Sequence, residues 1–155
     1  MEQIVSQAHK LLIKKRKNIA VTESCTGGLL SNLLTKIPGS SKYFILGIVA
    51  YSNKAKENIL KLPRDIIAQK GAVSKDVSGL LAKSVRLIAK TDFGIGVTGI
   101  AGPAGGSKEK PVGTVFISVD SKNKRICKEF NFTGSRAAIR KKSALKALEL
   151  LNKLL

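Results

Sequence analysis

A serine and a lysine, each placed just after a short apolar run, are the residues of this chain best suited to nucleophilic chemistry. Ser24 lies in the stretch TESCTGG after the β-rich run IAVTE, and Lys56 lies in YSNKAK after the apolar run FILGIVA. A lysine whose pKa is lowered by burial or by nearby positive charge can take the proton of a serine hydroxyl. The pair therefore predicts an activated serine, provided that the two runs are neighbouring strands.

Three polar corners follow predicted strands and are candidates for ligand binding: TESCTGG, AYSNKAK and TGIAGPAGG. In α/β sheets ligands gather at the loops beyond the carboxyl ends of the strands. Glycines let backbone N–H groups approach a ligand, and a helix beginning at Thr26 or Gly27 would point its positive end at an anion. We therefore expect substrate contacts from Thr26, Gly27, Gly28, Thr98, Gly99, Gly105 and Gly106. The alternative is that these residues only build turns and caps.

Other kinds of active site are poorly supplied. His9 is the only histidine and falls within a helical pattern, so no Ser-His-Asp triad can be assembled. Cys25 is an alternative nucleophile, but without a histidine partner its thiolate would depend on a helix end and on nearby lysines. The acidic residues are scattered, so no metal site is expected. The stretch GIAGPAGG is neither a Walker A loop nor a dinucleotide fingerprint, and nucleoside triphosphate binding is unsupported.

The spacing of apolar residues predicts helices that alternate with strands. An amphipathic helix ends at KKRKN, a strand follows in IAVTES, and further strands are expected in YFILGIVAYS and DFGIGVTGI. Asn53, Ser74 and either Thr133 or Ser135 are suited to cap later helices. VGTVFISVD and RICKEFNF flank SKNK as in a β-hairpin. These elements predict an α/β fold, a mixed sheet sandwiched between helices in three layers, with a C-terminal hairpin and a closing helix.

Length and composition favour one globular domain over residues 1–155. The formal net charge of +18 would attract nucleic acid, but lysines occur on nearly every segment and no aromatic residues are interleaved with them for base stacking. We therefore expect a solvated lysine surface, without nucleic acid as the partner. No apolar run approaches the ~20 residues needed to cross a bilayer, and no secretory signal precedes the first helix. A soluble, cytoplasmic protein is the expectation.

Six blocks occur together and in order: TESCTGG, GIVAYSNKAK, GAVS, VTGIAGPAGG, KPVGTV and FTGSRAAIR. In these blocks the chain resembles the CinA C-terminal-domain family, the nicotinamide-nucleotide amidases, over nearly its whole length. The resemblance implies an α/β fold and hydrolysis of the amide of nicotinamide mononucleotide to nicotinate mononucleotide and ammonia, in pyridine-nucleotide salvage. It implies no metal or organic cofactor. Carried over motif by motif, it implies that Ser24, Tyr51 and Lys56 are catalytic.

In this interpretation Ser24 attacks the carboxamide carbon, Lys56 takes the serine proton and Tyr51 orients or relays it. Backbone N–H groups near residues 26–28 would hold the oxyanion. The bland alternatives are that Ser24 caps a helix, that Tyr51 lies at the edge of the core and that Lys56 is a solvated helix lysine.

The substrate phosphate is expected near Gly105, Gly106 and Arg140, because glycine N–H groups and a guanidinium match phosphate oxygens, and Arg136 is a weaker candidate. The expected partner is a small-molecule nucleotide, and we expect a homo-oligomer. The competing hypothesis is a noncatalytic module that binds nucleotides or nucleic acid.

Overall fold

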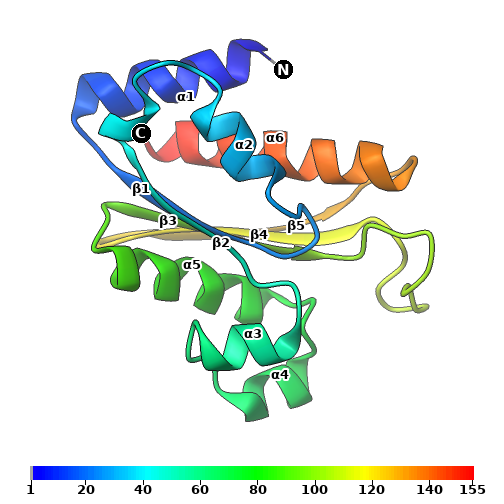
Figure 1. Cartoon of the computed structure of the whole chain (residues 1–155). Helices are drawn as coiled ribbons and strands as arrows, with labels where there is room; N and C mark the ends of the chain where they lie inside the picture. The colour runs from blue at the N-terminus through cyan, green and yellow to red at the C-terminus, as the bar shows by residue number, and fades with distance from the viewer. Residues whose placement is uncertain (1) are drawn as a thin grey trace.

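The computed structural model describes residues 2–155 and shows a five-stranded sheet between two layers of helices (Figure 1). This architecture confirms the predicted three-layer α/β fold. The elements in chain order are α1 (Glu2–Lys15), β1 (Ile19–Glu23), α2 (Leu29–Thr35), the 3₁₀ turn η1 (Ser40–Lys42), β2 (Phe44–Val49), α3 (Asn53–Asn58), α4 (Arg64–Lys70), α5 (Lys75–Ala89), β3 (Phe93–Gly99), β4 (Thr114–Ser121), β5 (Arg125–Asn131) and α6 (Arg136–Leu154).

The strand order β2-β1-β3-β4-β5 makes the sheet mixed. β1 pairs in parallel with β2 and β3, whereas β4 pairs antiparallel with β3 and β5. Glu23, the last residue of β1, lies opposite Val49 of β2 and Val97 of β3. The three parallel strands therefore end together, and the segments that follow them share one edge of the sheet.

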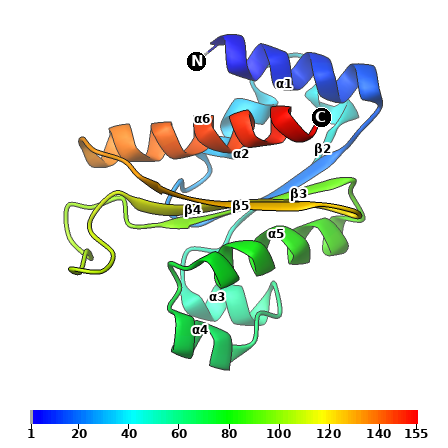
Figure 2. The same cartoon turned by 180° about the vertical axis from the view of Figure 1, so that it is seen from behind.

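Helices cover both faces of the sheet, with α1, α2 and α6 on one face and α3, α4 and α5 on the other (Figures 1 and 2). Successive residues of β1 serve the two sides, since Ile19 and Val21 belong to the core under α6 and Ala20 belongs to the core under α5. All five β1 residues are buried. Burial of a leucine or isoleucine side chain stabilises the fold by about 1.5–3 kcal/mol, which fixes the register of this central strand.

Two helix starts differ from the expectation. α3 is capped by Ser52, whose Oγ accepts a hydrogen bond from the N–H of Ala55 at 3.0 Å, so Asn53 is the first helical residue instead of the cap. α2 begins at Leu29 and not at Thr26 or Gly27, because Gly27 and Gly28 have φ values of +57° and +94° that a right-handed helix cannot contain.

The two serine caps expected further along the chain are confirmed. The side chain of Ser74 accepts from the N–H of Val77 at the start of α5, and that of Ser135 accepts from the N–H of Ala138 at the start of α6. Ser135 therefore fills the role for which Thr133 was the other candidate. No helix within residues 2–155 combines the length and apolar composition needed to span a bilayer.

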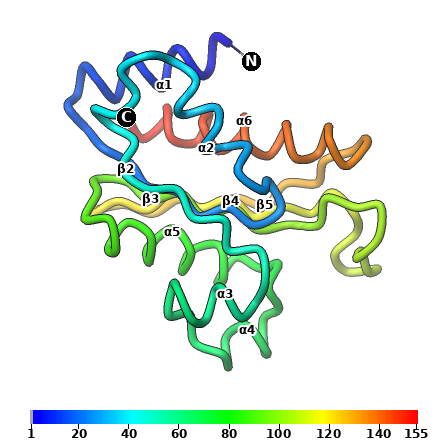
Figure 3. The backbone as a smooth tube through the Cα atoms, in the orientation of Figure 1, coloured from blue at the N-terminus to red at the C-terminus, as the bar shows by residue number. Residues whose placement is uncertain are grey.

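The loop of residues 100–113, between β3 and β4, extends past the edge where the parallel strands end, beside the first turn of α6 (Figure 3). The turn after β1 and the start of α3 lie at the same edge. The three predicted corners thus meet there.

Candidate active site

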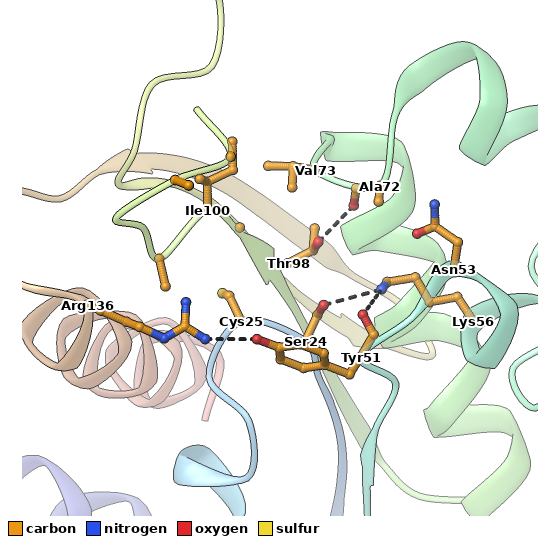
Figure 4. A pocket seen from close by; sticks show the side chains of 14 residues that line it. Ser24, Cys25, Tyr51, Asn53, Lys56, Ala72, Val73, Thr98, Ile100 and Arg136 are labelled. Carbon is orange, nitrogen blue, oxygen red and sulfur yellow. Dashed lines mark hydrogen bonds between the residues drawn. The ribbon is translucent and has the colours of Figure 1, made fainter. Parts of the chain in front are cut away.

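A cavity of about 290 Å³ opens at the edge where β1, β2 and β3 end (Figure 4). Its lining comes from all three predicted corners, from the segment before α5 and from the start of α6. The lining residues are Ser24, Cys25, Tyr51, Asn53, Lys56, Ala72, Val73, Thr98, Gly99, Ile100, Ala101, Ala104, Gly105 and Arg136.

Ser24 and Lys56 are in contact, as the spacing after parallel strands predicts. Lys56 Nζ lies 3.3 Å from Ser24 Oγ and 3.4 Å from the backbone oxygen of Tyr51 (Figure 4). Ser24 is 9% exposed and Lys56 is 1% exposed. Neither bland alternative holds, because Ser24 caps no helix and the Lys56 side chain is withdrawn from water.

Burial lowers the pKa of Lys56, because a charged ammonium is disfavoured away from water. Its two hydrogen-bond partners are uncharged oxygens, and it forms no ion pair in the part of the chain that the structure describes. The neutral amine, which can accept the serine proton, is therefore favoured.

Burial also raises the pKa of the neighbouring Cys25 to about 12. A thiol with this pKa stays protonated at neutral pH, and the protonated form is a weak nucleophile. The charge of a Cys25 thiolate would raise the pKa of Lys56, but that thiolate is not populated at neutral pH. The surroundings therefore favour Ser24 over Cys25 as the nucleophile.

Glu23 holds the corner that carries Ser24, a role that was not predicted from the sequence. Its fully buried carboxylate accepts from the backbone N–H groups of Gly28, Leu30 and Ser31 at 3.0, 3.0 and 2.8 Å, and from the Ser31 hydroxyl at 2.6 Å. These bonds satisfy donors that the first turn of α2 leaves without helical partners. The sequence did carry a signal for this role, because Glu23 is an acidic residue at the end of a mostly apolar strand and stands shortly before a helix.

Replacing Glu23 with glutamine should destabilise the protein. The amide removes the negative charge and, in either orientation, puts an NH₂ donor where at least one backbone N–H group needs an acceptor. We therefore expect a loss of about 1–3 kcal/mol and a fall in Tm of several degrees. Thermal denaturation followed by circular dichroism measures it. Glu57→Gln is the matched control, because the Glu57 partner Arg64 is exposed and such pairs contribute little. Equal Tm values for the two variants would contradict the role of Glu23.

The backbone N–H groups of residues 25–28, which follow Ser24, differ in their hydrogen bonds. The N–H of Gly27 donates to the oxygen of Ser24 at 3.1 Å, and that of Gly28 is used by Glu23. These two N–H groups are thus bonded within the protein, and the ligand contacts expected from Gly27 and Gly28 stay predictions. Within residues 2–155, no backbone oxygen accepts a hydrogen bond from the N–H groups of Cys25 and Thr26.

The two arginines of α6 that were candidates for the phosphate lie in different places. Arg136 lines the cavity, where its Nη1 donates to the oxygen of Gly102 and its Nη2 to the Tyr51 hydroxyl, both at 2.8 Å. Arg140, the first candidate for the phosphate, lies outside the lining, and its Nε and Nη2 donate to the oxygen of Thr26 at 3.2 and 2.8 Å.

Some of the other residues predicted to bind substrate line the cavity, and some do not. Thr98, Gly99 and Gly105 line the cavity, whereas Thr26 and Gly106 do not. At Gly106 a Cβ atom would lie 2.7 Å from the N of Val112, so this glycine permits a close approach within its own loop.

Tyr51 is 59% exposed and touches Arg136 through its hydroxyl and Lys56 through its backbone oxygen. No hydrogen bond joins this hydroxyl to Ser24 or Lys56 in the described chain, and its role in proton transfer stays a prediction. Asn53, Ala72 and Val73 also line the cavity, and no role in the site was predicted for them from the sequence. Ala72 and Val73 belong to the block GAVS.

Residues 2–155 contain no group of three or more histidine, cysteine, aspartate or glutamate side chains that could hold a metal ion. The polar groups that face the cavity are those of Ser24, Tyr51, Asn53, Lys56, Thr98 and Arg136. This set suits a nucleophilic serine with a lysine base and a cationic group at the rim.

Curated proteins with similar sequences are named CinA-like proteins. A CinA-like protein of Thermotoga maritima is 44% identical over 155 residues, which are 100% of this chain and 37% of that protein. A CinA-like protein of Geobacter sulfurreducens is 44% identical over 144 residues, 93% of this chain and 35% of that protein. The chain thus spans little more than a third of the length of these curated relatives.

Solved structures are similar over almost the whole chain. The competence/damage inducible protein CihA of Agrobacterium tumefaciens has 35% identity and a TM-score of 0.93, covering 97% of this chain and 94% of that one. A CinA superfamily protein of Escherichia coli has 29% identity and a TM-score of 0.94, covering 98% and 88%. The family model of the CinA C-terminal domain matches residues 1–155. The chain belongs to the CinA C-terminal domain family.

Proposed function

We propose that this protein hydrolyses the carboxamide of nicotinamide mononucleotide to nicotinate mononucleotide and ammonia. The observation that carries the proposal is the contact of 3.3 Å between a buried serine hydroxyl and a buried lysine amine at the wall of a cavity. Such a pair suits attack on an amide without a metal ion. The resemblance in six sequence blocks supplies the identity of the amide.

The reaction follows from the positions of these groups. Ser24 Oγ bonds to the carboxamide carbon while Lys56 Nζ accepts the hydroxyl proton, and the resulting ammonium gives a proton to the departing nitrogen as the C–N bond breaks. Water then attacks the acyl carbon while Lys56 Nζ accepts one of its protons. The ammonium returns this proton to Ser24 Oγ as the acyl C–O bond breaks, and the carboxylic acid that forms loses its own proton to solvent. Lys56 is neutral again at the end of each half-reaction. The lowered pKa favours the neutral amine that must accept a proton at the start of both.

The oxyanion formed by this attack needs hydrogen-bond donors beside Ser24. The N–H groups of Cys25 and Thr26 follow the nucleophile directly and donate to no backbone oxygen among the described residues. Donors of this kind contribute about 3–4 kcal/mol to transition-state stabilisation in comparable sites. Of these two residues only Cys25 lines the cavity, so we assign the oxyanion to the Cys25 N–H in place of those of Gly27 and Gly28.

Arg136 is the group best placed for the substrate phosphate. Its guanidinium lies at the rim of the cavity together with the Tyr51 hydroxyl, and an arginine fork matches the oxygens of a phosphate. The net charge of +18 adds a positive potential that favours approach of an anionic nucleotide.

The function is tested by measuring ammonia release from nicotinamide mononucleotide, with nicotinamide riboside as the comparison. We expect turnover of the nucleotide and a much lower kcat/KM for the riboside, which lacks the phosphate. Salt-sensitive retention of a polynucleotide without turnover of any amide would support the noncatalytic binding module instead.

Arg136→Ala should weaken binding of the nucleotide selectively. Loss of a hydrogen bond to a charged group costs about 1.5–3 kcal/mol, so KM for the nucleotide should rise by about 10- to 100-fold. The same variant should change kcat/KM for the riboside by less than about threefold, which separates phosphate binding from the tether that Arg136 makes to Gly102. A parallel loss with both substrates would place the phosphate elsewhere.

A further inference from the structure

Two loops that lie outside the sheet form the wall of the cavity opposite Ser24 and Lys56. Residues 71–74, between α4 and α5, contribute Ala72 and Val73, and residues 100–113, between β3 and β4, contribute Ile100 and Gly105. Figure 4 shows Ile100 and Val73 facing the serine and the lysine across the cavity. No ladder of strand hydrogen bonds sets the distance between these loops.

Lys110, which plays no part in the proposed chemistry, joins the two loops. Its Nζ donates to the oxygen of Val73 at 2.7 Å and to the oxygen of Lys70 at 3.2 Å. Lys70 is the last residue of α4, where carbonyl groups lack helical partners and favour a cation. Lys110 forms no ion pair among residues 2–155, so its charge is directed at backbone oxygens.

The base of the Lys110 side chain is itself fixed by a turn. The N–H of Lys110 donates to Ser107 Oγ at 3.0 Å, and the N–H of Ser107 donates to the oxygen of Lys110 at 2.9 Å. Near its other end the same loop is held by Arg136, which donates to the oxygen of Gly102. The loop is therefore held from two sides, and Lys110 is its link to the segment before α5.

The segment that Lys110 grips has every carbonyl group in use. The oxygen of Gly71 accepts from Ser74 Oγ at 2.9 Å and that of Ala72 from Thr98 Oγ1 at 2.8 Å, while Lys110 serves Lys70 and Val73. Thr98 thus ties Ala72 to the sheet, and Lys110 ties Val73 to the loop. Within the described chain, no other hydrogen bond connects residues 70–74 with residues 100–113.

We propose that Lys110 is a positioning residue that holds these two loops together and so sets the width of the cavity where the substrate enters. Its kinetic consequence rests on the proposed amidase function. Without the ammonium the two walls separate, so the substrate binds more weakly while Ser24 and Lys56 keep their contact.

Lys110→Met tests this role, because methionine keeps most of the apolar stem and loses the ammonium. Lys108→Met is the matched control, since Lys108 is exposed in the same loop and makes no hydrogen bond to residues 2–155. Amide hydrogen exchange of residues 71–78 and 100–113 should accelerate about tenfold in Lys110→Met, equal to ~1.4 kcal/mol of lost protection, and stay unchanged in Lys108→Met.

Steady-state kinetics provide the second measurement. KM for nicotinamide mononucleotide should rise about tenfold in Lys110→Met with kcat within about threefold of the wild type. Lys110→Arg, which keeps donors for both carbonyl groups, should restore exchange and KM, and it serves as the test if the methionine variant does not fold. Unchanged exchange in Lys110→Met, or faster exchange with an unchanged KM, would overturn the proposal.

The two proposals fail in different ways. If the wild-type protein releases no ammonia from any amide, the amidase function is wrong, and the hydrogen-exchange comparison still decides whether Lys110 holds the loops together.

Discussion

Ser24→Ala is expected to lower kcat for ammonia release by about 10⁴-fold or more, because removing the nucleophile of a serine hydrolase leaves only the rate supplied by binding and oxyanion stabilisation. The fold should persist. Ser24 is held through its backbone, whose N–H donates to the oxygen of Val97 at 3.0 Å, and its hydroxyl contacts only Lys56. A single-turnover ammonia assay together with a thermal denaturation curve measures both parts.

Cys25→Ala is the control for this experiment, since it alters the adjacent residue of the same turn. With its pKa near 12 the Cys25 thiol remains protonated, and activity should stay within a few-fold of the wild type. Near-normal turnover by Ser24→Ala, combined with inactive Cys25→Ala, would move the nucleophile to the cysteine.

Lys56→Arg should lower turnover by about 10³-fold or more at every pH, because a guanidinium remains protonated and cannot accept the serine proton. In the wild type, kcat/KM should rise with pH and level off above the lowered pKa of Lys56, below the usual lysine value of 10.5. The direction follows from the neutral fraction of the amine, which increases as pH passes upward through that pKa. A pH–rate profile of both proteins tests it, and a Lys56→Arg enzyme with wild-type turnover would exclude the amine as the base.

Lys56→Met separates the loss of activity from a loss of folding. Since the pKa of Lys56 is lower in the folded than in the unfolded protein, the unfolded chain binds more protons between that pKa and 10.5. Above pH 10.5 Lys56 is neutral in both states and does not destabilise the fold. As pH falls to the folded-state pKa, this stability is lost, because the unfolded chain is protonated first. The methionine variant lacks this penalty, so at neutral pH its Tm should equal or exceed that of the wild type while it releases no ammonia. A lower Tm would show that the amine stabilises the fold.

The contact between Ser24 and Lys56 could be predicted from the sequence because it depends on topology. Parallel strands place their carboxyl ends at one edge, and both residues follow such ends by a short distance. The buried runs IAVTE and DFGIGVTGI are recognisable by composition, which makes the order of layers predictable as well. The three corners met where this reasoning expected them.

The different contacts of Arg136 and Arg140 could not be predicted from the sequence. The two lie four residues apart on one face of α6, so helical spacing gives them the same direction, and only the path of the neighbouring turns decides which carbonyl each one meets. Glu23 was missed for a related reason. Its donors are arranged by Gly27 and Gly28, whose positive φ values are not visible in a pattern of apolar residues. The hydrogen bonds of Lys110 are to residues 37 and 40 positions away in the sequence, and local sequence patterns do not predict contacts at that separation.

The pairing of α1 with α6 has a consequence for how this domain can be built into longer polypeptides. Asn152 Nδ2 donates to the oxygen of Ile4 at 3.4 Å, so residues near both ends of the chain meet in the helix layer. α1 is the outermost helix, and α6 starts beside the loop of residues 100–113 and ends at the opposite edge of the sheet (Figure 2). A further domain fused at either terminus would leave from this layer and would not cross the cavity. This arrangement is compatible with the occurrence of the domain in longer chains, such as the relative from Thermotoga maritima, of which this chain covers 37%.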